Sequence, residues 1–161
     1  LMRELLGEAE SFLKPEHFRE DEKSYARNLV YEAGDGRLSL FALVWRPGQW
    51  TPVHDHGTWG VVGVLEGALE ERNYIRCDKD QDRREGCDRD IDLRRGGVIL
   101  MTPGTVTSFV PNPDHIHMTG VSEDRPRAVS LHLYGRALHD FHVYDVAAGT
   151  RRLIQVTHHD A

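Results

Sequence analysis

Two spacings of apolar residues divide the sequence near residue 24. Before that point, five apolar residues recur at the spacing of one helix face: Leu5, Leu6, Ala9, Phe12 and Leu13. They predict a short amphipathic helix, which ends at Lys14-Pro15 because proline cannot continue a helix. Since proline is favoured at the first position of a helix, a second, polar helical stretch is expected over residues 15–22, with its His17 facing solvent.

From Tyr25 onward, short runs rich in Val, Leu, Ile, Phe and Thr alternate with Gly, Pro, Asn and Asp turn signals. These runs predict strands over Ala26–Tyr31, Leu38–Trp45, Thr51–His54, Val61–Leu65, Leu69–Tyr74, Asp90–Leu93, Val98–Thr102, Val106–Val110, His115–Val121, Ala128–Tyr134, Phe141–Val146 and Arg151–Val156. Many short strands at close spacing are typical of an all-β sandwich or closed barrel. We therefore expect one domain over residues 1–161, with a helical segment at 1–24 and a β-barrel at 25–156.

Length and charge narrow the functional classes. The 161 residues suit one domain, and 20 Lys and Arg against 26 Asp and Glu give a net charge of −6, which argues against nucleic acid as a partner. The longest uninterrupted apolar run, Leu40–Trp45, is too short to span a membrane. No secretory signal pattern opens the sequence. A cytoplasmic protein without membrane contact is expected, while oligomeric state is left open.

A nearly all-charged segment, residues 76–89, holds both cysteines. It is interpreted as a solvated excursion between strands. The sequence leaves the state of Cys77 and Cys87 open, although a reducing compartment does not favour a disulfide between them.

The ten histidines carry the chemical signal. His54-Asp55-His56 lies at the end of a predicted strand, where alternation points His54 and His56 to one face and Asp55 to the other. Two imidazoles on one face are spaced to share a metal ion. Taken alone, a His-x-His pair favours an ordinary surface pair over a metal site.

The spacing around this pair resembles the first motif of the cupins. It runs from Gly48 through His54-x-His56 and Gly60 to Gly67, and Gly60 stands where that motif normally has a glutamate ligand. Gly97 and Pro103 resemble the start of the second cupin motif. The resemblance implies a small jelly-roll β-barrel with a metal inside it, and a metal site that lacks its usual carboxylate.

Three segments resemble the cysteine dioxygenase family of thiol dioxygenases more specifically. They are residues 25–30 (Tyr-Ala-Arg-Asn-Leu-Val), the histidine pair, and residues 130–134 (Ser-Leu-His-Leu-Tyr). The family's third metal ligand lies thirteen residues before its serine, which implies His117 rather than His115. His115 is interpreted as an exposed loop residue. The resemblance also implies Fe(2+), although three histidines would suit zinc as well.

Three neutral imidazoles suit such a reaction chemically. The usual non-haem Fe(II) arrangement has two histidines and one carboxylate. Without the carboxylate, a substrate thiolate would supply the missing negative charge, and metal coordination favours that thiolate by lowering the thiol pKa.

Further residues are expected to act on substrate. Ser130, His132 and Tyr134 share one strand face and suit a hydrogen-bond relay that ends at the tyrosine hydroxyl, the roles that the resemblance also implies. The resemblance assigns the substrate carboxylate to Arg27, whose guanidinium offers a matching fork, and Tyr25 is expected to add a hydroxyl contact. A Cys–Tyr crosslink, present in some members, is not expected, since Gly60 stands at the corresponding position.

The function expected is therefore an iron thiol dioxygenase that converts L-cysteine and O2 to cysteine sulfinate. The arginine favours L-cysteine, because relatives that oxidise 3-mercaptopropionate carry glutamine there. Two alternatives stay open: dioxygenation of 3-mercaptopropionate or another thiol carboxylate, and a non-catalytic metal-binding cupin that acts as a sensor. His158 and His159 are expected in a disordered tail.

Overall fold

The computed structural model describes residues 1–78, 88–111 and 115–160. At the N-terminus the expected helix is divided into α1 (Met2–Gly7) and α2 (Ala9–Phe12), because Glu8 between them has φ −108° and ψ 12°, outside the helical range. The polar stretch forms only one 3-10 turn, η1 (Pro15–Phe18). The solvated position expected for His17 is wrong: its ring is buried, and its Nδ1 accepts a hydrogen bond from the Lys14 amide.

The strands confirm the all-β expectation. They are β1 (Ala26–Glu32), β2 (Ser39–Trp45), β3 (Gly60–Glu66), β4 (Leu69–Arg76), β5 (Leu93–Met101), β6 (Val106–Phe109), β7 (Ile116–Gly120), β8 (Ala128–Tyr134), β9 (Asp140–Asp145) and β10 (Thr150–Gln155). The strand predicted at 90–93 is wrong except for Leu93, where β5 begins, and the run predicted at 98–102 forms the second half of β5. The strand predicted at Thr51–His54 is not continuous, since Pro52 has no amide hydrogen to donate, yet residues on either side of it pair with β7.

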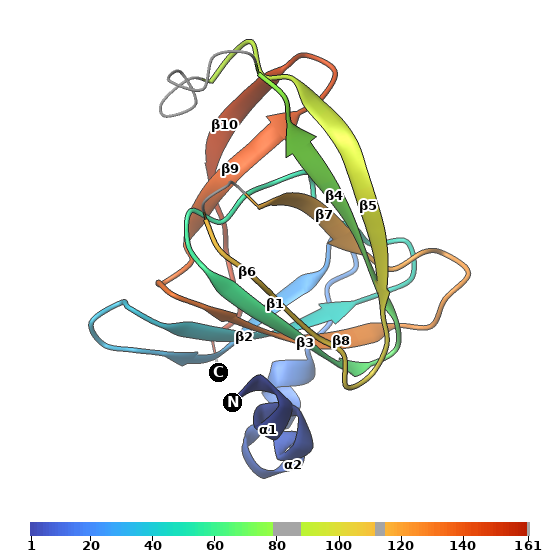
Figure 1. Ribbon diagram of the computed structural model, residues 1–161. Helices are drawn as coiled ribbons and strands as arrows, with labels where there is room; N and C mark the ends of the chain where they lie inside the picture. The colour runs from blue at the N-terminus through green and yellow to red at the C-terminus, as the bar shows by residue number, and fades with distance from the viewer. Residues whose placement is uncertain (79–87, 112–114, 161) are drawn as a thin grey trace.

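Two walls face each other across the barrel (Figure 1). The five-stranded wall has the strand order β1-β2-β8-β3-β6. The second, which we call the composite wall, contains β5-β4-β7, residues 48–55 and the β9–β10 hairpin. Residues 48–55 join its parts because His54 bridges both His117 on β7 and Val143 on β9. The composite wall is therefore one surface assembled from four separate stretches of sequence: residues 48–55, β4–β5, β7 and β9–β10.

The core explains why β2 and β8 are buried along their whole length. On β2, Phe41, Leu43 and Trp45 belong to the cluster inside the barrel, whereas Leu40 and Ala42 belong to a second cluster with the N-terminal helices. Gly63 on β3 permits that close approach, since a Cβ there would lie 2.9 Å from Met2 Cγ. The helices therefore cover the outer face of the five-stranded wall.

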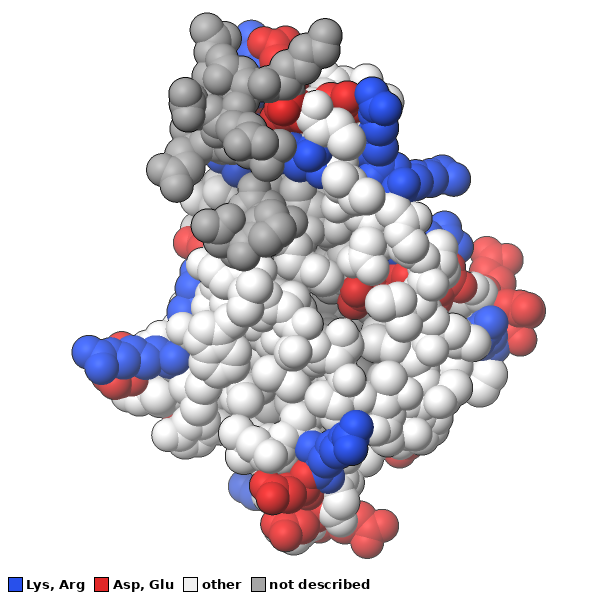
Figure 2. Space-filling model, viewed as in Figure 1, with Lys and Arg blue, Asp and Glu red and all other residues white. Residues whose placement is uncertain are grey.

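The surface carries mixed charge. In Figure 2 the basic and acidic side chains lie mostly around the periphery of the visible face, with the two signs interspersed. Among the described residues, no helix is both long and apolar enough to cross a bilayer.

Candidate metal and substrate site

Three histidines from distant parts of the sequence converge inside the barrel. His54 lies between β7 and β9, His56 follows in the next loop, and His117 lies on β7. One ring nitrogen of each falls within 4.8 Å of the others, and His54 Nε2 is 3.1 Å from His56 Nε2. All three side chains are buried. The structure thus brings together the three residues expected to bind metal.

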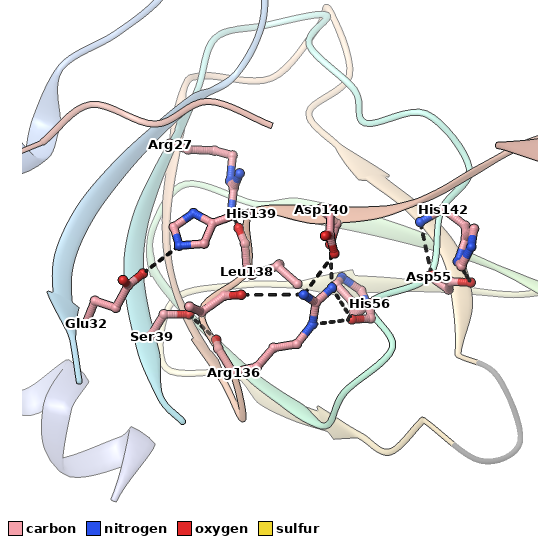
Figure 3. Close-up of polar contacts among 11 residues, drawn as sticks. Arg27, Glu32, Ser39, Asp55, His56, Arg136, Leu138, His139, Asp140 and His142 are labelled. Atoms are coloured by element: carbon pink, nitrogen blue, oxygen red, sulfur yellow. Dashed lines mark hydrogen bonds and ion pairs between the residues drawn. The ribbon is translucent and has the colours of Figure 1, made fainter. Parts of the chain in front are cut away.

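The loop that carries His56 is anchored from outside the cluster. As expected from alternation, Asp55 points the other way, where it accepts hydrogen bonds from the Tyr144 hydroxyl at 2.8 Å and the His142 amide at 3.2 Å. Arg136, after β8, donates to the His56 carbonyl and pairs with Asp140 (Figure 3). These contacts hold in place a loop that no sheet ladder supports.

The environment keeps the three imidazoles neutral, which is the form that binds metal. Burial is the largest cause of the low pKa of both His54 and His117, about 3 in each case. Burial and the neighbouring His54 also hold the pKa of His56 well below its ordinary value. His54 Nδ1–H donates to the Pro52 carbonyl at 3.0 Å, which leaves Nε2 free. The donor set therefore fits a metal ion.

The glutamate that the cupin motif normally has at the position of Gly60 is absent, and an aromatic ring occupies its space. A Cβ on Gly60 would lie 2.3 Å from Phe109 Cζ. The Phe109 ring stacks against both His56 and His115, with its centroid 4.5 Å from each. The His56 and His115 centroids are 6.4 Å apart, so the three rings pack together beside Gly60.

Sequence reasoning missed the acidic residue nearest the cluster, Glu71. Its carboxyl lies 3.1 Å from His117 Nδ1 and 3.7 Å from His115 Nε2. Burial raises its pKa, and His115 and Asn73 partly offset this rise. The sequence did contain a signal for Glu71. It is two residues after the buried Leu69 on β4, so both side chains point to the same face of the strand. The exposure expected for His115 is also wrong: it lies just before β7 but is partly buried, because it packs against Phe109.

The polar ladder on β8 has the contacts expected of it. Ser130 Oγ lies 2.8 Å from His132 Nε2, and His132 Nδ1 lies 3.1 Å from the Tyr134 hydroxyl. The indole of Trp45, which can only donate, donates to Ser130 Oγ at 2.9 Å. Burial lowers the pKa of His132 to about 3 and raises that of Tyr134. At neutral pH the ring is therefore neutral and the phenol keeps its proton.

Arg27 lies on β1 with part of its guanidinium unused. Its Nη2 donates to the Leu138 carbonyl at 2.9 Å, and its Cζ lies 4.6 Å above the centre of the Phe41 ring (Figure 3). Within the described part of the chain, the buried Nη1 has no hydrogen-bond partner. A buried charged donor without a partner fits an anionic ligand.

The expected site residues other than Ser130 line two adjoining spaces. The inner one, about 20 Å³, lies among the three histidines, His132 and Tyr134, and holds about one water-sized species. The outer one, about 300 Å³, lies between residues 21–27 and 155–159. Arg27 and Tyr25 line both, so they stand where the two spaces meet.

The tail expected to be disordered is paired with β1 instead. The His159 amide donates to the Arg27 carbonyl, and the His159 carbonyl accepts from the Leu29 amide. The His158 ring packs edge-on against Phe41 at 5.6 Å. An open edge of β1 provided the hydrogen-bonding groups for this pairing. Of the two cysteines, Cys77 is free, and Cys87 lies outside the described residues.

Comparisons with known proteins agree with this geometry. A family profile described as cysteine dioxygenase type I matches residues 14–147. Cysteine dioxygenase type 1 of Homo sapiens is 26% identical over 141 residues, which cover 86% of this chain and 64% of the human one. The Danio rerio protein of the same name is 28% identical over 139 residues, with 85% and 64% covered. The chain thus spans slightly less than two thirds of these relatives.

Solved structures resemble the fold. A Klebsiella pneumoniae protein with a double-stranded β-helix domain matches with a TM-score of 0.52 and 14% identity, over 88% of this chain and 93% of that one. The protein TT1209 from Thermus thermophilus matches with a TM-score of 0.52 and 17% identity, over 78% and 97%. Sequence identities this low show a similarity of fold only. They confirm the expected cupin-like barrel.

Proposed function

Since this chain belongs to the cysteine dioxygenase type I family, we propose that it is a non-haem iron thiol dioxygenase that oxidises L-cysteine with O2 to cysteine sulfinate. One observation carries the proposal. Three neutral imidazoles, a guanidinium nitrogen with no hydrogen-bond partner among the described residues and a protonated phenol all line the inner space. These groups can bind a metal, an acid group and a reacting oxygen, respectively.

We assign Fe(2+) to His54, His56 and His117. When bound, iron would supply the redox chemistry that joins O2 to sulfur. The three histidines contribute no negative charge, so a substrate thiolate balances the charge of the site. This favours thiolate ligands over neutral ones.

Arg27 and Tyr25 are assigned to the substrate carboxylate. Nη1 of Arg27 is free to bind it, because the Leu138 carbonyl and the Phe41 ring already hold the rest of the side chain. Arg27 and Tyr25 lie between the two spaces. A small thiol carboxylate can therefore place its acid group outward and its sulfur toward the histidines. L-cysteine has the required functional groups.

Tyr134 is assigned the control of protons. Since Trp45 donates to Ser130, the serine hydroxyl donates to His132 Nε2 and His132 Nδ1–H donates to the Tyr134 oxygen. The phenol proton then remains available to the cavity, where it can hydrogen-bond a reacting oxygen. In the complete reaction, one thiol and one O2 give one sulfinic acid. Both oxygen atoms end on sulfur, and no external reductant is required.

Oxygen uptake by iron-loaded protein tests the proposal. Protein loaded anaerobically with Fe(2+) is given L-cysteine, 3-mercaptopropionate or cysteamine, and oxygen uptake is recorded. The mass of the sulfinate formed from 18O2 is measured by mass spectrometry. We expect one O2 per cysteine and two labelled oxygens in the product. Faster turnover of 3-mercaptopropionate at low concentration would assign that substrate instead. Bound iron without oxygen uptake on any thiol would favour a non-catalytic metal-binding protein.

A further inference from the structure

We propose that Glu71 is a positioning residue for the metal centre. Its carboxyl accepts a hydrogen bond from His117 Nδ1–H and so directs Nε2 of that ring toward His54 and His56. The inference rests on the proposed metal site but does not depend on which thiol is oxidised. The cupin motif normally has a carboxylate beside the metal, at the position of Gly60. In this protein the carboxyl group of Glu71 lies behind His117 instead.

The sheet register sets this contact. In the β4–β7 ladder Glu71 lies opposite Thr119, and His117 is two residues before Thr119 on the same face. The Glu71 side chain therefore reaches His117 from behind, with Oε2 3.1 Å from Nδ1. Glu71 is only 2% exposed. Its partners among the described residues are imidazoles and the Asn73 amide, not a lysine or arginine.

Two other acceptors lie near the same nitrogen. His115 Nε2 is 3.2 Å and Thr119 Oγ1 is 3.4 Å from His117 Nδ1. The Glu71 oxygen is nearer than either, and a carboxylate is a stronger acceptor than an imidazole or a hydroxyl. Glu71 therefore determines which nitrogen of His117 carries the proton.

The position of the acid decides what it does. A carboxylate at Gly60 would lie where the Phe109 ring stacks against His56, beside the metal. Glu71 instead lies outside the donor set, where it orients one ligand and leaves three nitrogen donors. A carboxylate hydrogen-bonded to a ligating imidazole raises the basicity of that ligand. The arrangement strengthens metal binding and still leaves the thiolate to supply the coordinated negative charge.

Metal titration of a conservative variant tests the role. Metal-free wild-type protein, Glu71→Gln and the control Glu70→Gln are titrated with Co2+, and its visible absorption bands are followed. Glu70 is the preceding residue on β4, points to the opposite face and pairs with Arg72. We expect Co2+ affinity to fall roughly 10- to 100-fold in Glu71→Gln, with altered bands, and to stay within about 2-fold of wild type in Glu70→Gln. Wild-type affinity and bands in a folded Glu71→Gln would overturn the inference.

A second measurement needs no substitution and covers the case of a variant that fails to fold. In Zn2+-loaded wild-type protein with 15N-labelled histidine, NMR should show a slowly exchanging proton on His117 Nδ1 and metal on Nε2. Metal on Nδ1 would overturn the proposal. Because both tests read metal binding alone, a protein that oxidises no thiol could still confirm the role of Glu71. Conversely, thiol oxidation with unchanged metal affinity in Glu71→Gln would reject this role and leave the proposed function intact.

Discussion

The two walls of the barrel supply the site in different ways. The five-stranded wall contributes Ser130, His132 and Tyr134 from consecutive same-face positions of β8, a strand paired on both sides by β2 and β3. The composite wall contributes His54 and His117. Isolated bridges join His54 to β7 and β9, and a short ladder joins β7, which carries His117, to β4. In the five-stranded wall, alternation along one strand brings the side chains to the same face. In the composite wall, the register between separate strands brings them together. We therefore expect substitutions in the composite wall to affect metal binding and those in the five-stranded wall to affect turnover.

The largest effect is expected from His117→Ala. Removing one of three donors should weaken metal binding by more than the roughly 100-fold typical of losing an outer hydrogen bond. His115→Ala is the matched control, since His115 is not a member of the group formed by His54, His56 and His117, and it should retain metal. Metal content after dialysis measures both. Loss of metal from His115→Ala alone would show that the wrong histidine of this segment has been assigned.

Tyr134→Phe should distinguish the roles of the two walls most clearly, because it should lower turnover without affecting metal binding. The phenylalanine variant keeps the three metal ligands, so metal content should match wild type. Turnover should fall by about 10²- to 10⁴-fold, the usual contribution of a positioned proton donor. Tyr31→Phe, at an exposed tyrosine of β1, should leave turnover unchanged. Full activity in Tyr134→Phe would remove the proposed relay.

Arg27→Gln should act on substrate binding. Loss of a charged contact to a carboxylate costs about 1.5–3 kcal/mol, or roughly 10- to 150-fold in kcat/KM for cysteine. Cysteamine, which has no carboxylate, serves as the internal control and should be affected much less. Steady-state oxygen uptake compares the two thiols. An equal loss for both would argue against Arg27 as the carboxylate-binding residue.

The smallest effect on the chemistry is expected at Gly60 and Phe109, which pair between β3 and β6 in the five-stranded wall. In Gly60→Ala the new methyl would meet the Phe109 ring at 2.3 Å, so the ring must shift. Overpacking of this kind costs about 1–3 kcal/mol of unfolding free energy. Gly97→Ala is the matched control on β5, because its Cβ would meet no atom within 4 Å. Chemical denaturation measures both, and equal stability of the two variants would show that the ring adapts freely.

Local patterns were enough to predict some of this architecture. Alternation of leucines with Ser130, His132 and Tyr134 predicted one polar face, and the structure shows that face directed into the barrel. The family resemblance, not a local pattern, singled out His117 over His115, and His117 does meet His54 and His56. Other local interpretations were wrong. The pattern around His17 and the tail at His158 is polar, yet both rings are largely buried, because neighbouring segments cover them.

The amino-acid sequence by itself determined the strands, the alternation of their faces and the residue types able to bind metal, because these depend on neighbours a few positions apart. Only the tertiary structure decided that Glu71 lies behind His117, that Phe109 occupies the space beside Gly60, and that one nitrogen of Arg27 is left without a partner among the described residues. Those facts depend on which strand lies next to which and in what register. Residues far apart in the chain come into contact only when the barrel closes.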